Sequence, residues 1–189
     1  HNNEKVKLSD VIEFEQNPRY ERLHWITIKN GETECISPKY LQIWEFCWSP
    51  NGKGFAAVAS DLPFAHSWYN ATLVTFTGNS NRYSEIHRNV DRQLAKPTWS
   101  NKGNKIAFIS SIWSDRGLVA GGIFVVPGDG GKARELTLGH IASDTWLEWT
   151  ENDSALVTIA HEKGSISLSN ISIATGYRTT VWKDEAVFS

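Results

Sequence analysis

The chain has 189 residues, of which 40% are hydrophobic and 21% are charged, and its formal net charge is −2. This size and composition predict a soluble globular domain with a real core. The near-neutral charge argues against partners of the nucleic-acid class, and no apolar run is long enough to suggest a membrane helix. Two cysteines, Cys35 and Cys47, form no CxxC pair, so we interpret both as reduced thiols and expect no metal or cofactor. We expect a cytoplasmic protein.

The first 40 residues predict part of a β unit. Residues 6–8 and 11–14 look extended, and residues 23–28 and 33–36 are predicted strands joined by an Asn-Gly turn at 29–32. These two strands look like the second half of a four-stranded unit. The chain begins with His1 and has no methionine, so we expect it to be a piece of a longer protein.

A short phrase then occurs three times. It starts at Trp48 (Trp-Ser-Pro-Asn-Gly-Lys), at Trp99 (Trp-Ser-Asn-Lys-Gly-Asn) and at Trp149 (Trp-Thr-Glu-Asn-Asp-Ser), so the tryptophans are 51 and 50 residues apart. Each phrase predicts the end of one strand and a tight turn that favours glycine. The three strands predicted after each phrase are 54–59, 70–77 and 83–87, then 105–110, 122–126 and 133–137, then 155–161, 165–173 and 178–182.

Four short antiparallel strands in each repeat of about 50 residues are typical of a β-propeller blade. We therefore predict an all-β fold, a single β-propeller fragment over 1–189, with approximate blades at 1–40, 41–89, 90–139 and 140–189. About 3.5 to 4 blades form a partial or open propeller, and we expect self-association through its two open edges. The structural repeat residues are Trp48, Gly52, Trp99, Gly103 and Trp149, the tryptophans serving as apolar plugs between blades.

The outer strands show the same period. Ile36, Ile86 and Leu136 are each 50 residues apart, and Val181 follows after 45. The outer strands therefore follow the same repeat as the tryptophans.

We assign no catalytic residues to this sequence. Asp61 and Asp115 each follow the second strand of a blade, where loops often meet ligands, but turn capping explains them better. Asp184 and Glu185 follow the last predicted strand, where a charged connector between blades is the preferred interpretation. The histidines are scattered singly, without the i, i+4 pairing of a metal site.

The Trp-Ser-Pro-Asn-Gly-Lys phrase with its apolar strand resembles the TolB-like or WD40-like β-propeller repeat. Three further runs resemble the propeller of the prolyl oligopeptidase family: Gly-Gly-Ile-Phe-Val-Val-Pro-Gly-Asp-Gly-Gly-Lys-Ala-Arg-Glu-Leu-Thr at 121–137, Trp-Leu-Glu-Trp-Thr-Glu-Asn-Asp-Ser-Ala-Leu at 146–156, and Ile-Ala-Thr-Gly-Tyr-Arg-Thr-Thr-Val-Trp at 173–182.

This resemblance implies a propeller that covers an α/β-hydrolase domain with a Ser-Asp-His triad, excludes folded proteins and admits short peptides. The chain has no Gly-x-Ser-x-Gly motif, so the resemblance implies a catalytic half beyond Ser189. Some dipeptidyl members hold the substrate amino terminus with a Glu pair, a role we do not assign to Asp184 and Glu185.

Three functions remain open. The first is the non-catalytic propeller of such a serine peptidase, whose peptide substrate is bound through the missing hydrolase domain. The second is a TolB-like scaffold for protein–protein interaction. The third is a propeller enzyme acting on a polysaccharide in its channel.

Overall fold

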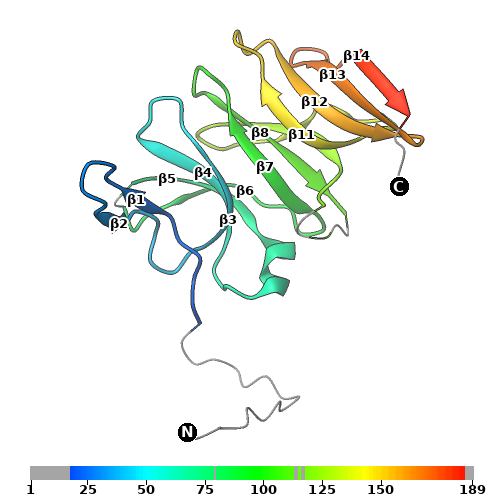
Figure 1. Cartoon of the computed structure of the whole chain (residues 1–189). Helices are drawn as coiled ribbons and strands as arrows, with labels where there is room; N and C mark the ends of the chain where they lie inside the picture. Colours follow the sequence, from blue (N-terminus) through cyan, green and yellow to red (C-terminus); the bar gives the residue numbers. More distant parts are fainter. Residues whose placement is uncertain (1–17, 79, 113–114, 116–117, 186–189) are drawn as a thin grey trace, which may run out of the picture.

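The computed structural model describes residues 18–78, 80–112, 115 and 118–185. They form three four-stranded antiparallel sheets and one two-stranded hairpin, in chain order (Figure 1). The predicted all-β fold is confirmed, and the chain is a partial β-propeller of three blades and half of another. No helix of the described part is long and apolar enough to cross a membrane.

The strands follow one another without crossovers. The hairpin consists of β1 (His24–Ile26) and β2 (Thr33–Cys35). Sheet 1 consists of β3 (Gln42–Trp48), β4 (Gly54–Ser60), β5 (Thr72–Thr77) and β6 (Ser84–His87), with the 3₁₀ helix η1 (Ala65–Asn70) between β4 and β5. Sheet 2 consists of β7 (Gln93–Trp99), β8 (Lys105–Ser111), β9 (Gly122–Pro127) and β10 (Arg134–Glu135). Sheet 3 consists of β11 (Ser143–Trp149), β12 (Ala155–Glu162), β13 (Ser165–Ser172) and β14 (Arg178–Glu185).

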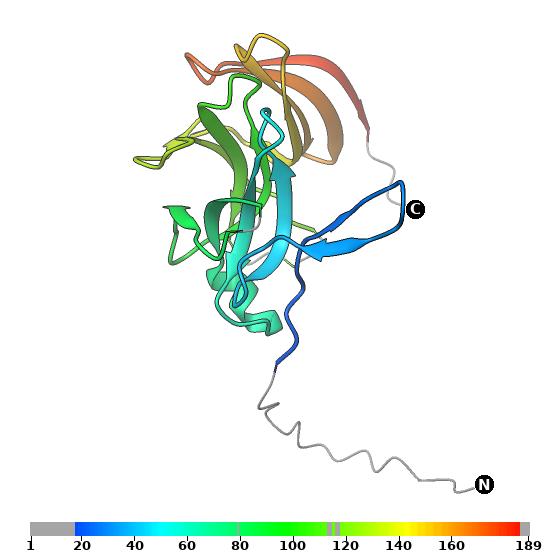
Figure 2. The same cartoon turned by 90° about the vertical axis from the view of Figure 1, so that its left-hand side faces the viewer.

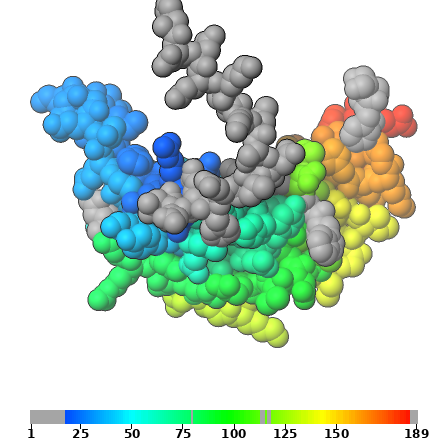
Figure 3. Space-filling model, turned by 90° about the horizontal axis from the view of Figure 1, so that it is seen from below, coloured from blue at the N-terminus to red at the C-terminus, as the bar shows by residue number. Residues whose placement is uncertain are grey.

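The sheets stand side by side as an arc, and Figure 2 shows their successive rotation. The first strand β7 contacts the first strands β3 and β11 of the neighbouring sheets, which makes these three the inner strands. The β1–β2 hairpin lies at one end of the arc and sheet 3 at the other (Figure 3).

The repeated phrase forms the same turn each time. The hydroxyl oxygen of Ser49 accepts a hydrogen bond from the N–H of Gly54 at 2.9 Å, and Ser100 and Thr150 bind the equivalent N–H groups at 3.1 Å. The fifth residue has positive φ in every copy: 68° at Gly52, 70° at Gly103 and 58° at Asp153. The phrase therefore encodes the turn, with the hydroxyl closing it and the fifth residue reversing the chain.

Each inner strand is irregular at the same place. The pairing with the second strand shifts between Ile43 and Glu45, between Ala95 and Thr98, and between Asp144 and Trp146. Pro97 lies inside β7, within the irregular stretch between Ala95 and Thr98. A proline fits inside this strand because the bulge removes the need for its N–H.

The core lies between successive sheets. Ile36, Ile86 and Leu136 are 4 to 6% exposed, and each packs in a cluster with the sheet that follows it. Val181, the fourth residue of this series, is 61% exposed on sheet 3. Equivalent outer-strand residues therefore build each seam between sheets, and the last one has no sheet against it among the described residues.

Three predicted boundaries were wrong. The strand predicted at 70–77 starts at Thr72, because η1 occupies the residues up to Asn70. The strand predicted at 133–137 is only Arg134–Glu135. Asp184 and Glu185 do not form a connector after the last strand, because β14 continues through Glu185 and pairs with β13 along this length. The extended stretches predicted at 6–8 and 11–14 lie outside the described residues.

Candidate functional site

The inner strands of all three sheets meet at a groove of about 410 Å³, which we call the inner-strand face. Glu45 and Phe46 come from β3, Lys96 from β7, and Trp146 and Glu148 from β11. Propeller ligands have access to such a face through the axis of the ring, so it is the first candidate site.

The two carboxylates of this face are held by sheet 2. The backbone N–H of Lys96 donates to Glu45 Oε2 at 2.7 Å, and its ammonium group lies 3.9 Å from the same oxygen. The Thr98 hydroxyl donates to Glu148 Oε1 at 3.3 Å. Glu45 and Lys96 stand three residues before a repeat tryptophan, as does Trp146, so the period itself marks these positions. The sequence analysis did not identify these three residues, because within each repeat phrase it considered the tryptophan and the turn after it.

Cys47 also lines this groove. Burial raises the pKa of its thiol to about 11, against the lowering effect of N–H groups from Trp99 and Ala56. Both cysteines are free, as the sequence predicted. Cys47 is therefore a neutral thiol at physiological pH and a poor nucleophile.

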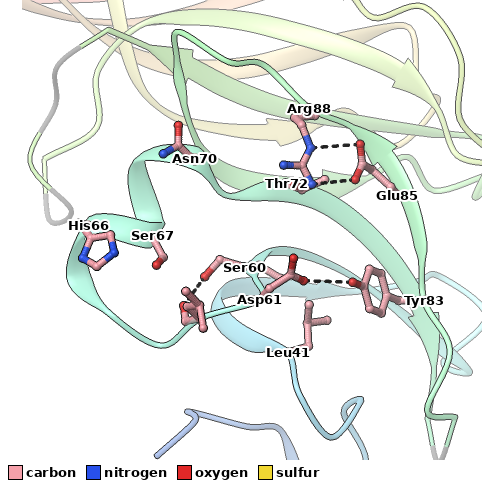
Figure 4. A pocket seen from close by; sticks show the side chains of 12 residues that line it. Leu41, Ser60, Asp61, His66, Ser67, Asn70, Thr72, Tyr83, Glu85 and Arg88 are labelled. Atoms are coloured by element: carbon pink, nitrogen blue, oxygen red, sulfur yellow. Dashed lines mark hydrogen bonds and ion pairs between the residues drawn. The ribbon is translucent and has the colours of Figure 1, made fainter. Parts of the chain in front are cut away.

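A second candidate is a pocket of about 290 Å³ at the end of sheet 1, between the segment after β4, η1 and β6 (Figure 4). Asp61 Oδ1 accepts a hydrogen bond from the Tyr83 hydroxyl at 3.2 Å, and Arg88 forms an ion pair with Glu85 at 2.9 Å. The wall opposite these pairs is formed by η1, which presents His66 (Figure 4). Each acidic side chain thus has a partner within the pocket.

Burial and the neighbouring Asp61 carboxylate both raise the pKa of Tyr83, because they disfavour a phenolate. Tyr83 is therefore a stable hydrogen-bond donor to Asp61. The pocket therefore offers several polar groups for binding a ligand.

The candidate aspartates of the sequence have different surroundings. Asp61 follows β4 as expected, but its carboxylate binds Tyr83 rather than its own turn. Asp115 is exposed, and its carbonyl oxygen accepts a bond from the N–H of Leu118 at 3.0 Å. The structure does not bring these two residues into one site, since Asp61 belongs to sheet 1 and Asp115 to the β8–β9 connection. Asp184 and Glu185 are exposed on β14.

The repeat tryptophans have three different environments. Trp149 is 6% exposed, and its indole N–H donates to the carbonyl oxygen of Thr98 in sheet 2 at 3.1 Å. Trp99 is half-buried against the cluster between sheets 1 and 2. Trp48 is 47% exposed and contacts Trp25 of the hairpin, with ring centroids 5.0 Å apart.

A buried ion pair lies in sheet 3, in contact with the loop before β11. Arg178 donates to Asp144 Oδ2 at 2.6 Å, to the Thr158 hydroxyl at 3.2 Å and to His140 Nδ1 at 3.3 Å. Asp144 is completely buried, and burial raises the pKa of its carboxyl despite the opposing effect of Arg178. No pattern in the sequence indicated this pair, because its members are 34 residues apart.

The described residues contain no group of three His, Cys, Asp or Glu side chains that could hold a metal ion.

Comparison with known proteins gives no match by sequence: no protein family matches the chain, and neither does any curated protein. Solved structures do resemble it. Oligogalacturonate lyase from Vibrio parahaemolyticus has a TM-score of 0.66 at 15% identity, over 86% of this chain and 48% of the lyase. TolB from Acinetobacter baumannii has a TM-score of 0.60 at 15% identity, over 85% of this chain and 37% of TolB. A puromycin-hydrolysing peptidase from Mycobacterium tuberculosis has a TM-score of 0.66 at 14% identity, over 85% of this chain and 27% of the peptidase.

These likenesses establish the propeller fold. The chain spans about half the length of the lyase and less of the other two proteins. The neighbours include TolB propellers and peptidase propellers. The resemblance to these two groups of propellers is therefore supported for the fold.

Proposed function

We propose that this chain is a non-catalytic propeller scaffold that controls the access of peptides to a hydrolase domain located outside residues 1–189. The observation that carries the proposal is the inner-strand face, where Glu45, Glu148 and Lys96 converge beside exposed rings of Phe46 and Trp146. Carboxylates suit an amino terminus or a basic side chain, and aromatic rings suit apolar side chains of a peptide.

The peptidase-like run at 121–137 supports the proposal through architecture. Arg134 donates to the carbonyl oxygens of Ile173 and Ala174 in sheet 3, and Leu136 is buried in the seam between sheets 2 and 3. Thr137 Oγ1 accepts a hydrogen bond from the N–H of Ile123 at 2.9 Å. Arg134 and Leu136 join sheets 2 and 3, and Thr137 closes sheet 2 on itself, so the run has a structural role in the assembly of neighbouring blades.

The test uses the complete gene product and a variant that lacks residues 18–185. We expect the variant to cleave a folded protein substrate that the complete product spares, while both cleave a short chromogenic peptide. Equal selectivity for the two substrates in both proteins would contradict gating. The chain alone should show no amidase turnover, and turnover by it would overturn a scaffold function.

A second measurement addresses the inner-strand face itself. Exchange of Glu45 and Glu148 for Gln should raise the KM for a short peptide with a free amino terminus more than for its acetylated form. The matched control is Asp184→Asn, an exposed carboxylate on β14 away from this groove. A cytoplasmic location belongs to the same proposal, supported by the two free thiols and tested by cell fractionation.

TolB-like docking of a partner protein is the second candidate. The exposed rings of Trp146 and Trp182 on the last sheet favour it, because aromatic residues are enriched at protein interfaces. A pull-down in which a partner is lost on exchange of these residues, with unchanged peptide gating, would favour this function over the first. Action on a polysaccharide has no support beyond the fold likeness to the lyase.

A further inference from the structure

A pocket of about 510 Å³, which we call the turn pocket, lies where the turns of sheet 1 come close to sheet 2. It is lined by the β3–β4 turn, by described residues of β5, β6 and the segment that joins them, and by Trp99 of sheet 2. Sheets 1 and 2 each have four strands. The turn pocket therefore lies between two complete sheets, and it shares no lining residue with the inner-strand face.

The row of sheet 1 that borders this pocket differs from the equivalent row of sheet 2. Both rows begin at the alanine eight residues after a repeat tryptophan. The row continues with Thr75 and Ser84 in sheet 1, and with Val125 and Arg134 in sheet 2. Arg134 crosses its seam and donates to carbonyl oxygens in a turn of sheet 3. Ser84 is too short to cross, so the place that an arginine occupies in one seam is hollow in the other.

Two cationic side chains line the turn pocket, Lys53 and Arg82, and none of its described lining residues is acidic. Within the described part of the chain, neither side chain has an ion pair or a hydrogen bond. The position of Lys53 in the repeat phrase is held by Asn104 in the second copy and by Ser154 in the third. Of the three copies, only the one at this pocket has a cation there.

The backbone at both cations is held by neighbouring side chains. Asn51 Oδ1 accepts a hydrogen bond from the N–H of Lys53 at 2.9 Å, and Ser80 Oγ accepts one from the N–H of Arg82 at 3.0 Å. These are the local bonds of Asx and Ser/Thr turns. Binding at the two cations therefore has to order their side chains more than their backbone, which lowers its entropic cost.

The unpaired polar side chains of this pocket are donors. Lysine and arginine can only donate, and the hydroxyl groups of Thr75, Thr77 and Ser84, which also line the pocket, can donate as well. A ligand that complements this set supplies acceptors and negative charge. Phosphate has both, since a phosphate monoester carries nearly two negative charges and three acceptor oxygens.

We propose that the turn pocket binds an aryl phosphate. Lys53 and Arg82 hold the phosphate, and its aromatic body lies beside the rings of Trp99 and Tyr83, which are half-buried and 42% exposed. The pocket is much larger than a phosphate ion alone, so an attached ring has room. A free aryl phosphate and the phosphotyrosine side chain of a peptide share this chemistry. The site does not depend on the function proposed for the inner-strand face.

The test is isothermal titration calorimetry of the full chain with phenyl phosphate, at low ionic strength because salt screens exposed charges. We expect one site, and binding of inorganic phosphate at least about tenfold weaker because it lacks the ring. An acetylated phosphotyrosine peptide that binds more tightly than phenyl phosphate would support a peptide as the source of the group, and weaker binding would support a small molecule. Binding of neither probe would overturn the proposal.

Three variants locate the site. Lys53→Gln and Arg82→Gln should each weaken phenyl phosphate binding at least about tenfold, because each loses a charge-assisted hydrogen bond. Ser84→Phe keeps the net charge but fills the hollow, so it should abolish binding. All three residues are exposed, so the circular dichroism spectrum should stay unchanged.

Lys132→Gln is the matched control. Lys132 is an exposed cation two residues before Arg134, as Arg82 is two residues before Ser84, but it does not line the turn pocket. Its exchange should leave the affinity unchanged. Binding that persists in Ser84→Phe, or that weakens equally in Lys132→Gln, would mean a general attraction of anions to the surface and would overturn the assignment to this pocket.

Discussion

The carboxylate of Asp153 in sheet 3 accepts hydrogen bonds from the backbone N–H groups of Asn101 and Lys102 in sheet 2, at 2.7 and 2.9 Å. Asp153 occupies the turn position that glycine has in the other two copies, and it does so at a φ of 58°. The equivalent contact between sheets 1 and 2 is apolar, since Pro50 lies against Gly103. One turn position thus joins the sheets by packing in one seam and by hydrogen bonds in the other.

Asp153→Asn should lower the free energy of unfolding by about 1 to 2 kcal/mol, because an amide cannot accept two N–H groups with both of its ends. Chemical denaturation at pH 7 measures this. Asp91→Asn, an exchange at an exposed aspartate outside the seams, is the control and should be close to neutral. Equal stability of Asp153→Asn and the parent chain would contradict a bonded seam.

The effect of Asp153 should depend on pH. Partial burial opposes its ionisation, but the N–H groups of Lys102 and Asn101 outweigh burial and lower the pKa. A lowered pKa means that its contribution is complete above the unfolded value near 3.9 and is lost as the pH falls below it. The stability difference between the parent chain and Asp153→Asn should therefore shrink between about pH 5 and pH 2. A constant difference over this range would show that the charge is not involved.

Arg178→Leu should lower the free energy of unfolding by about 3 to 5 kcal/mol at pH 7, because it leaves the buried carboxylate of Asp144 without its cation. Burial already raises the pKa of Asp144, and loss of Arg178 raises it further. A raised pKa makes the protonated carboxyl the better tolerated form, so the deficit of Arg178→Leu should decrease as the pH falls. Asp144→Leu combined with Arg178→Leu should recover stability relative to Arg178→Leu alone. If the deficit did not decrease at low pH and the double variant were no more stable than Arg178→Leu, the ion-pair explanation would be contradicted.

Gly176→Ala and Gly164→Ala should differ strongly in stability. Both glycines have positive φ, 74° and 78°, so both exchanges carry a backbone cost of about 1 kcal/mol or more. A Cβ at Gly164 meets nothing within 4 Å, whereas a Cβ at Gly176 clashes with the carbonyl oxygen of Leu136 in sheet 2. Thermal unfolding should show a clearly larger loss for Gly176→Ala. Equal losses would mean that sheets 2 and 3 do not approach each other this closely.

Cys47 should react with iodoacetamide about 100-fold more slowly than a thiol of ordinary pKa, because a pKa of about 11 leaves little thiolate at pH 8. Mass spectrometry of the alkylated peptides measures the rate. Unfolding in denaturant should bring it to the rate of a free cysteine, which serves as the internal control. Fast labelling of Cys47 in the folded chain would contradict its burial.

The parts that sequence could predict are those set by local chemistry and repetition. The hydroxyl and the positive-φ residue of each phrase specify the turn without contacts from distant residues. The turn in turn marks where one strand ends and the next begins. The series Ile36, Ile86 and Leu136 also showed, by its spacing alone, that the outer strands follow the repeat. These features depend on residues that are near one another in sequence, which is why a single sequence revealed them.

The parts that sequence missed depend on contacts between distant segments. Asp144 is paired with Arg178 across the width of sheet 3, and Tyr83 meets Asp61 from another strand. The strand expected at 70–77 begins later, because the residues before it form η1. The Trp68 ring of η1 is buried in the core. Of the pocket in Figure 4, only Asp61 was a candidate beforehand, since its place after β4 was the one regular feature of that segment.

The links between sheets 2 and 3 are spread over the whole height of the seam. Trp149 reaches back to Thr98 near the axis, Asp153 binds at the turn, and Arg134 reaches forward to the β13–β14 turn at the periphery. A protease that cut the exposed connection between Leu138 and Ile141 would sever the only peptide bonds joining these two sheets. The fragments should nevertheless stay together, and fragments made separately should reassemble, because side-chain contacts hold sheets 2 and 3 together without the connecting peptide.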